Sequence, residues 1–201
     1  MKGTAFCGAH RVGKTTLARA LSTELNLAFV ETPTSKVAIN LGIDVSKNLD
    51  FKTRIILQTA ILEAYEETFS KIFKENVPWI SDRSPLDALA YTLVDTYNTN
   101  YLERIEFKSF IIKYQYDCIE MVNKYFQNII HVRPGIEPVY AEGKASLSKE
   151  SIYGIDSTLA LNLENWLAAP TSPNLFKMDK DMLDLQERME FCRTILSGEW
   201  I

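Results

Sequence analysis

The chain has 201 residues, of which 46% are hydrophobic and 24% are charged, as in an ordinary globular domain with a sizeable core. Its formal net charge of −4 argues against a basic nucleic-acid-binding domain. The 3 cysteines are scattered, without the spacing of a metal site or a disulfide framework, so we expect a reduced, cytoplasmic compartment. The apolar runs are too short to cross a membrane, and the chain enters its first predicted strand at once, so we expect no signal peptide.

The first predicted elements are a strand ending at Cys7 and a helix beginning near Lys14, joined by a glycine-containing loop. Gly8, Gly13, Lys14 and Thr15 occupy the fixed positions of G-x-x-x-x-G-K-S/T, the phosphate-binding P-loop. The motif places Lys14 on the β- and γ-phosphates of ATP and the Thr15 hydroxyl on Mg²⁺. Because Lys14 follows a glycine loop, we expect it to be solvated in the empty protein. The predicted ATP-binding residues are Gly8, Ala9, His10, Arg11, Val12, Gly13, Lys14, Thr15 and Thr16.

Beyond the P-loop, predicted strands alternate with predicted helices. Strands are expected at 28–30, 77–81, 129–132 and 174–178, and helices at 14–25, 49–76, from 85 onward, and at 102–126, 156–167 and 183–196. We expect the buried stripe of the first long helix to contain Ile55, Ile56, Thr59, Leu62, Tyr65, Phe69 and Ile72. That of the second is expected to contain Ile105, Ile112, Ile119, Met121 and Val122, extended by Tyr114, Tyr116 and Tyr125. This alternation predicts a parallel sheet covered by helices on both faces.

Candidate catalytic residues follow the predicted strands, because ligands of such sheets bind at the carboxyl ends of the strands. Glu31 follows the second strand, Asp82-Arg83 the third, and Arg133 the fourth. A carboxylate at Asp82 can hold Mg²⁺ through water or accept a proton from an acceptor hydroxyl. The forked guanidinium of Arg83 suits a phosphoryl oxygen. The alternative for this pair is a helix-capping aspartate with a salt-bridged arginine.

The P-loop, the Asp82-Arg83 pair and the segment DRSPLDALAY together resemble the P-loop nucleoside and nucleoside-monophosphate kinases. Within this group, the motifs resemble those of thymidylate kinase, deoxynucleoside kinase and ribosylnicotinamide-kinase-like proteins. Ala90-Tyr91 match an Ala-Tyr pair of thymidylate kinases, Asp87 replaces their serine, and Arg11 matches an arginine in the P-loop of some of them. The resemblance implies an α/β fold of the nucleotide-kinase type, a five-stranded parallel sheet in the order 2-3-1-4-5 with helices on both faces.

The resemblance also implies where the acceptor binds. Glu31 and Gln58 stand where deoxynucleoside kinases carry a strand-ending glutamate and a glutamine that reads the base. The acceptor is therefore expected between Glu31, Gln58, Arg83 and a lid at residues 135–153, and Tyr91 is also expected to bind it. Glu31 or Asp82 is the expected base if the acceptor is a hydroxyl, and a phosphate acceptor needs none.

A lid over ATP is expected at residues 135–153 within a single domain spanning 1–201, by position in the same families. Lys144 fits a basic flap that excludes water and contacts the substrate, and the alternative is a plain surface loop. The lid carries no arginine, whereas Arg11 lies in the P-loop beside the expected γ-phosphate. We therefore predict that Arg11 supplies the main cation for the transferring phosphoryl group, with Arg133 in reserve.

The sequence thus predicts a transferase that uses ATP and Mg²⁺ to phosphorylate a nucleoside or nucleoside monophosphate, of deoxy type. Its expected partner is a small acceptor molecule, with neither nucleic acid nor membrane, and a homodimer is left open. One alternative is a kinase acting on a hydroxyl of a modified base in a polynucleotide, which needs a basic groove that the net charge disfavours. Another is a nucleotide-dependent switch or NTPase without a small acceptor.

Overall fold

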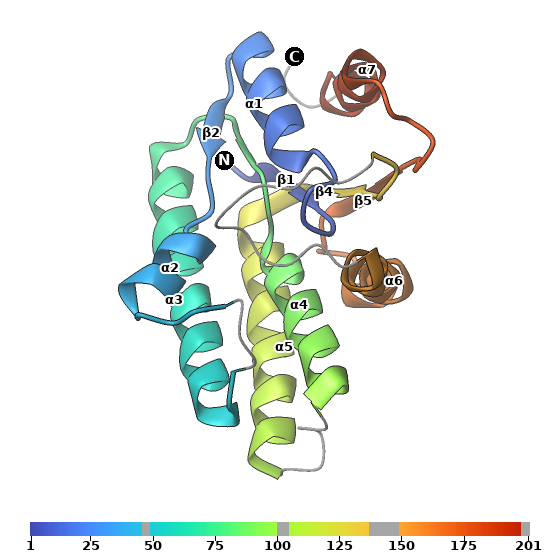
Figure 1. The fold of residues 1–201 in the computed structure, drawn as a ribbon. Helices are drawn as coiled ribbons and strands as arrows, with labels where there is room; N and C mark the ends of the chain where they lie inside the picture. Colours follow the sequence, from blue (N-terminus) through green and yellow to red (C-terminus); the bar gives the residue numbers. More distant parts are fainter. Residues whose placement is uncertain (46–48, 100–104, 137–148, 198–201) are drawn as a thin grey trace.

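The computed structural model describes residues 1–45, 49–99, 105–136 and 149–197 (Figure 1). Parallel strands form a 5-stranded sheet in the order β2-β3-β1-β4-β5, which confirms the predicted fold class and strand order. The strands are β1 (Gly3–Cys7), β2 (Ala28–Val30), β3 (Trp79–Ser81), β4 (Phe126–Val132) and β5 (Asn174–Met178). The central strand β1 is buried along its whole length, as expected of a parallel strand covered on both faces.

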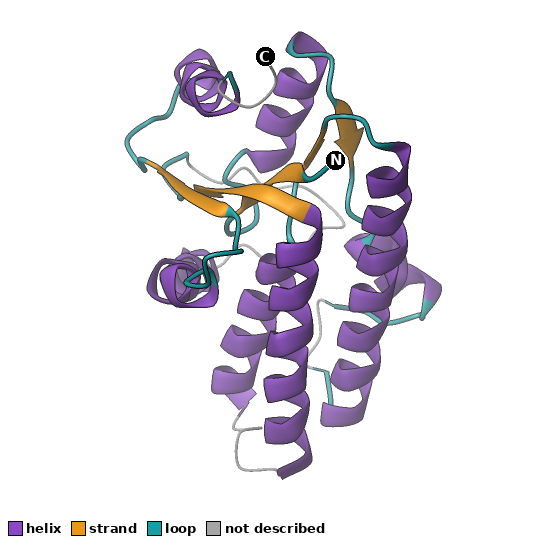
Figure 2. Ribbon diagram, turned by 180° about the vertical axis from the view of Figure 1, so that it is seen from behind, coloured by secondary structure: helices purple, strands orange, loops and turns teal. Residues whose placement is uncertain are grey.

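Helices cover both faces of this sheet. Helices α1 and α7 lie on one face and α4, α5 and α6 on the other, with α3 packed beside α5 (Figures 1 and 2). Their bounds are α1 (Lys14–Glu24), α2 (Thr34–Asn40), α3 (Phe51–Glu75), α4 (Pro85–Thr99), α5 (Ile105–Tyr125), α6 (Lys149–Trp166) and α7 (Leu185–Leu196). Among the described helices, none is long and apolar enough to cross a membrane.

The predicted buried stripes of the two long helices were partly wrong. Ile56 on α3 and Ile112 on α5 are 55% and 72% exposed, and Thr59, Ile105 and Tyr116 are exposed as well. Tyr65 and Phe69 are buried as predicted, and the inward face of α3 also carries Leu57, Ile61 and two polar side chains, Arg54 and Gln58. These polar groups are paired with side chains of other helices, and a search for apolar residues alone missed them.

Helix α6 begins at Lys149, well before its predicted start at Asp156. Ile152 and Ile155 extend its buried face, and Gly154 within the helix had suggested a loop. Residues 149–153 of the expected lid are therefore helical, while residues 137–148, which include Lys144, lie outside the described part of the chain.

A row of polar side chains crosses the sheet, from the buried Thr4 and Asn128 to the exposed Asn174. Asn128 donates from Nδ2 to the Thr4 hydroxyl at 3.3 Å and accepts at Oδ1 from Asn174 Nδ2 at 3.1 Å. Thr4, Asn128 and Asn174 are also direct register partners on β1, β4 and β5. The hydrogen bonds between these three side chains therefore depend on the strands keeping this register.

Candidate active site

The P-loop glycines sit where any side chain would clash or be strained. Gly8 has a φ of +152°, and a Cβ built on it would lie 2.3 Å from the Val132 carbonyl oxygen of β4. Gly13 has a φ of +88° and directly precedes α1. Arg11 is the non-glycine residue in the loop with a left-handed backbone, at a φ of 63°. The loop thereby forms a tight cradle at the carboxyl end of β1, which fits a phosphate group.

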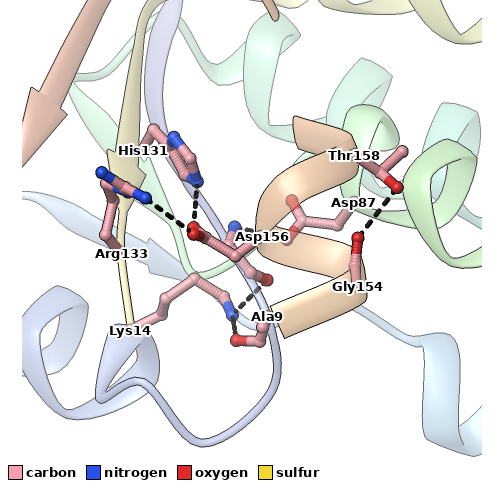
Figure 3. A network of polar contacts seen from close by, with 9 residues as sticks. Ala9, Lys14, Asp87, His131, Arg133, Gly154, Asp156 and Thr158 are labelled. Carbon is pink, nitrogen blue, oxygen red and sulfur yellow. Dashed lines mark hydrogen bonds and ion pairs between the residues drawn. The ribbon is translucent and has the colours of Figure 1, made fainter. Parts of the chain in front are cut away.

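Lys14 is folded back onto its own loop in this structure. Its Nζ donates to the carbonyl oxygens of Gly8 at 2.8 Å and Ala9 at 2.5 Å, and the residue is only 5% exposed (Figure 3). Burial, assisted by the positive charge of Arg83, lowers the pKa of Lys14 to about 8. The expectation of a solvated Lys14 was therefore wrong, because the carbonyls of the loop enclose the ammonium group.

The two predicted metal residues meet directly. The Thr15 hydroxyl donates to Asp82 Oδ2 at 2.9 Å, and Asp82 follows β3 at the neighbouring strand end. The other Asp82 oxygen accepts from the Thr32 N–H and hydroxyl, both at 3.2 Å. A hydroxyl beside a carboxylate is a donor set that Mg²⁺ accepts together with several waters. Thr32, which follows β2, was missed from the sequence because no local motif marks it.

Arg83 and Tyr91 lie next to one another beside the P-loop. The guanidinium carbon of Arg83 is 5.7 Å from the centre of the Tyr91 ring, and the Tyr91 hydroxyl is 3.0 Å from His10 Nδ1. The predicted acceptor residues Arg83 and Tyr91 thus adjoin the predicted nucleotide loop. This arrangement brings a cation from the end of β3 and a phenol from α4 to the same edge of the sheet.

Asp87 is the residue that the sequence left without a role. It is fully buried in the first turn of α4, where Oδ1 accepts the Gly8 N–H at 3.0 Å. Its Oδ2 accepts the Ser84 N–H at 2.8 Å and the Ser84 hydroxyl at 3.1 Å. The Ser84-x-x-Asp87 spacing is that of a capping box, which could have signalled the local bonds. The bond to Gly8 spans 79 residues and has no local signal.

Gln58 lies on the buried face of α3, and Glu31 does not join it. Gln58 Oε1 accepts from the Tyr114 hydroxyl of α5 at 3.0 Å. The Glu31 side chain is 59% exposed and forms an ion pair with Arg19 of α1 at 3.2 Å. Arg19 also lies over the ring of Phe29, which shares a face with Glu31 two positions along the chain. In this structure the Glu31 carboxylate is therefore engaged by Arg19, and its role as a base stays a prediction.

Arg11 faces a cavity between the P-loop and the start of α6. The cavity measures about 150 Å³ and is lined by His10, Arg11, Val12, Pro134, Gly135, Ile136, Lys149, Ile152 and Tyr153. Both described ends of the expected lid thus border the P-loop. A larger open hollow of about 690 Å³ lies near Lys2 and the end of α5, at the opposite edge of the sheet, and contains none of the predicted site residues.

Arg133, at the end of β4, is held by a carboxylate of α6. Its Nη2 lies 3.1 Å from Asp156 Oδ2, and His131 Nε2 lies 3.1 Å from Asp156 Oδ1 in an ion-pair contact that lacks hydrogen-bond alignment (Figure 3). Burial raises the pKa of Asp156, but the contacts with His131 and Arg133 outweigh it and hold that pKa below its usual value. In this structure the positive charge of Arg133 is therefore paired with the Asp156 carboxylate.

Solved structures of similar fold include several kinases. Deoxyadenosine kinase from M. mycoides with bound dCTP matches with a TM-score of 0.68 at 17% identity, over 98% of this chain and 99% of that chain. Thymidylate kinase from Candida albicans matches with a TM-score of 0.69 at 13% identity, over 98% and 91%. NadR protein in complex with NR matches with a TM-score of 0.63 at 15% identity, over 100% and 51%. The likeness shows that the chain shares the fold of these proteins.

Sequence comparison adds a family assignment. No curated protein matches the chain in sequence. The AAA_28 family, described as an AAA domain, matches residues 4–121, which is more than half of the chain and includes the P-loop, Asp82-Arg83 and Asp87. The chain therefore belongs to the AAA_28 family.

Proposed function

We propose that this protein is a Mg²⁺-dependent kinase that transfers the γ-phosphate of ATP to a nucleoside or nucleoside monophosphate, of deoxy type. The observation that carries the proposal is the meeting of Lys14, the Thr15–Asp82 pair and Arg83 at adjoining strand ends. A phosphate cradle, a metal-binding pair and an arginine on the acceptor side are the parts that phosphoryl transfer requires. The fold shared with nucleoside and nucleotide kinases supports the same reading.

Donor binding begins at the P-loop. Its N–H groups receive the phosphates, and Lys14 exchanges the carbonyls of Gly8 and Ala9 for phosphate oxygens. Thr15 and Asp82 would hold Mg²⁺, which neutralises charge on the β- and γ-phosphates when bound. Arg11 adds a guanidinium at the mouth of the cavity, and a lid at 135–153 with Lys144 excludes water.

The acceptor binds on the other side of the cluster formed by Lys14, the Thr15–Asp82 pair and Arg83. Arg83 and Tyr91 orient the acceptor near the γ-phosphate, while Gln58 reads its base from α3. Asp82 is the first candidate for the base that takes a proton from an acceptor hydroxyl, because it lies beside Thr15 at the P-loop. Glu31 is the second candidate and would have to leave Arg19 to act.

A turnover screen tests the proposal. The purified protein is incubated with ATP and Mg²⁺, alone and with each common deoxynucleoside or deoxynucleoside monophosphate, and ADP and phosphorylated acceptor are quantified. Acceptor-dependent formation of both products is expected, and Lys14→Met serves as the inactive control. ADP release without any acceptor would instead indicate an NTPase or switch. Phosphorylation of an oligonucleotide alone would indicate a polynucleotide kinase.

A further inference from the structure

Asp87 bridges two loops that belong to opposite halves of the proposed site. Its Oδ1 accepts from Gly8 at the start of the P-loop, and its Oδ2 accepts from both donors of Ser84, next to Arg83. The bonds measure 2.8–3.1 Å, and Asp87, Gly8 and Ser84 are all buried. Since the loops are joined through one carboxylate, a shift of either loop must be followed by the other or must break a buried hydrogen bond.

The negative charge of Asp87 also interacts with a cation in each half of the proposed site. Lys14 and Arg83 are the cations whose positive charges act most strongly on it, and both oppose the rise in the pKa of Asp87 that burial causes. Lys14 and Arg83 repel one another, as the effect of Arg83 on the pKa of Lys14 shows. A buried anion between two cations allows both to converge on one point, where a phosphoryl group would pass.

No other side chain of similar size offers the same contacts. Asparagine has a single acceptor oxygen, so it can serve Gly8 or Ser84 but must turn its NH₂ group toward the other donor. Glutamate keeps the charge but adds a methylene to a position with no exposed surface. Ser84→Ala removes only the hydroxyl donor and leaves the Ser84 N–H on the carboxylate.

We propose that Asp87 is a positioning residue that couples the two half-sites, so that an acceptor bound beside Arg83 tightens ATP at the P-loop, and ATP tightens the acceptor. This inference rests on the proposed kinase function. Asp87 itself contacts neither substrate and acts through Gly8 and Ser84. By thermodynamic linkage the enhancement must be equal in both directions, and a factor of about 5–150 is the usual size.

Calorimetry on Asp87→Asn tests the coupling. The affinity for a non-hydrolysable ATP analogue is measured without and with the acceptor that turned over fastest in the screen above. The parent is expected to bind the analogue about 5–150-fold more tightly when the acceptor is present. In Asp87→Asn that factor is expected to fall to about 1, while each ligand alone binds within about threefold of the parent, and kcat drops about 10²-fold from misplacement.

Asp50→Ala is the control for lost stability, because alanine removes a helix cap that asparagine would keep. Asp50 caps α3 with an equivalent pair of bonds, from the Thr53 N–H and hydroxyl, but touches no part of the P-loop. It is expected to lower the Tm and leave the coupling factor intact. Equal loss of coupling in both variants would mean that general destabilisation, not Asp87, sets the factor.

Each remaining outcome is decisive. A folded Asp87→Asn protein with parental coupling overturns the inference. If Asp87→Asn does not fold, Ser84→Ala decides, with a several-fold smaller coupling factor expected and an unchanged factor counting against the role of Asp87. A parent that binds both ligands without coupling also overturns the inference and leaves the kinase proposal standing. A parent that binds neither ligand refutes the kinase proposal itself.

Discussion

The Thr15 hydroxyl donates to Asp82 Oδ2 at 2.9 Å, so the first turn of α1 and the end of β3 are joined by the two groups best suited to Mg²⁺. Asp82 is only 5% exposed and its other oxygen is occupied by Thr32. The carboxylate is thus fixed before any ion arrives. A carboxylate that is already oriented loses little conformational entropy when it binds a metal ion. This favours binding of Mg²⁺ in one defined geometry.

Asp82→Asn should therefore raise the Mg²⁺ concentration needed for half-maximal activity by about 10–100-fold, the usual cost of losing one orienting carboxylate. Asparagine keeps the size of the side chain and can still accept from Thr32, so circular dichroism should show an intact fold. The measurement is initial rate against Mg²⁺ concentration. An unchanged half-saturation point would remove Asp82 from the metal site.

Lys14→Met should abolish transfer and yet stabilise the protein. The lowered pKa of Lys14 means that burial, with the charge of Arg83, penalises the protonated form in the folded state. At neutral pH the substitution should raise the free energy of unfolding by about 1 kcal/mol or more, because a buried charge is replaced by an apolar side chain of similar length.

The pH dependence of that difference follows from the same shift. The pKa of Lys14 is about 8 in the folded protein and returns to its ordinary value of 10.5 on unfolding, so between these values the unfolded chain binds more protons. The parent should therefore gain stability as pH rises through this window, and its gap to Lys14→Met should narrow. Urea unfolding of both proteins from pH 7 to pH 10 measures the gap. A gap that stays constant or widens contradicts the buried, charge-penalised Lys14.

Arg11→Ala should lower kcat by about 10²–10⁴-fold with little change in ATP affinity, since its guanidinium would act only in the transition state. Alanine retains a Cβ at the left-handed φ of 63°, so the side chain is tested without freeing the backbone as glycine would. Arg11→Lys should recover part of the loss. Arg133→Ala is the control, because Arg133 is paired with Asp156, and it should affect kcat far less. A raised KM for ATP with normal kcat would place Arg11 on the adenine instead.

Tyr114→Phe should weaken acceptor binding through Gln58. The substitution keeps the ring of a residue that is 2% exposed and removes the hydroxyl that fixes the Gln58 amide. The acceptor KM should rise several-fold, and Gln58→Ala should raise it about tenfold, consistent with the loss of about 1–3 kcal/mol. The KM for ATP should stay at the parental value in both variants. Equal changes in the two KM values would indicate a general disturbance of the core.

Local patterns accounted for the P-loop and the alternation of strands and helices, and the family resemblance supplied the order of the strands. The glycine spacing around Lys14 and the apolar run before it are short-range signals, as is the Asp82-Arg83 pair after a strand. The contacts that complete the site are long-range. Nothing near Asp87 in sequence points to Gly8, and Asp156 meets Arg133 only because α6 brings it there.

The direction of side chains was the second feature that the sequence did not predict. Residues that follow a strand alternate between its faces, so Thr32 meets Asp82 while its neighbour Glu31 turns to Arg19. The motif comparison singled out Glu31. Such a comparison gives the position of a residue along the chain but not the direction in which its side chain points. On α3, an assignment of buried residues from apolar periodicity missed inward polar residues such as Gln58.

The hydrogen-bonded row of Thr4, Asn128 and Asn174 favours the observed register of the strands over a shifted one. Sliding β5 by one residue against β4 would carry the Asn174 amide away from Asn128 and break the hydrogen bond between their side chains. A misaligned sheet is thereby penalised before the helices pack over it. An extra residue inserted between α6 and β5 should accordingly bulge into the 167–173 connection and leave the strand alignment, and the P-loop beyond it, undisturbed.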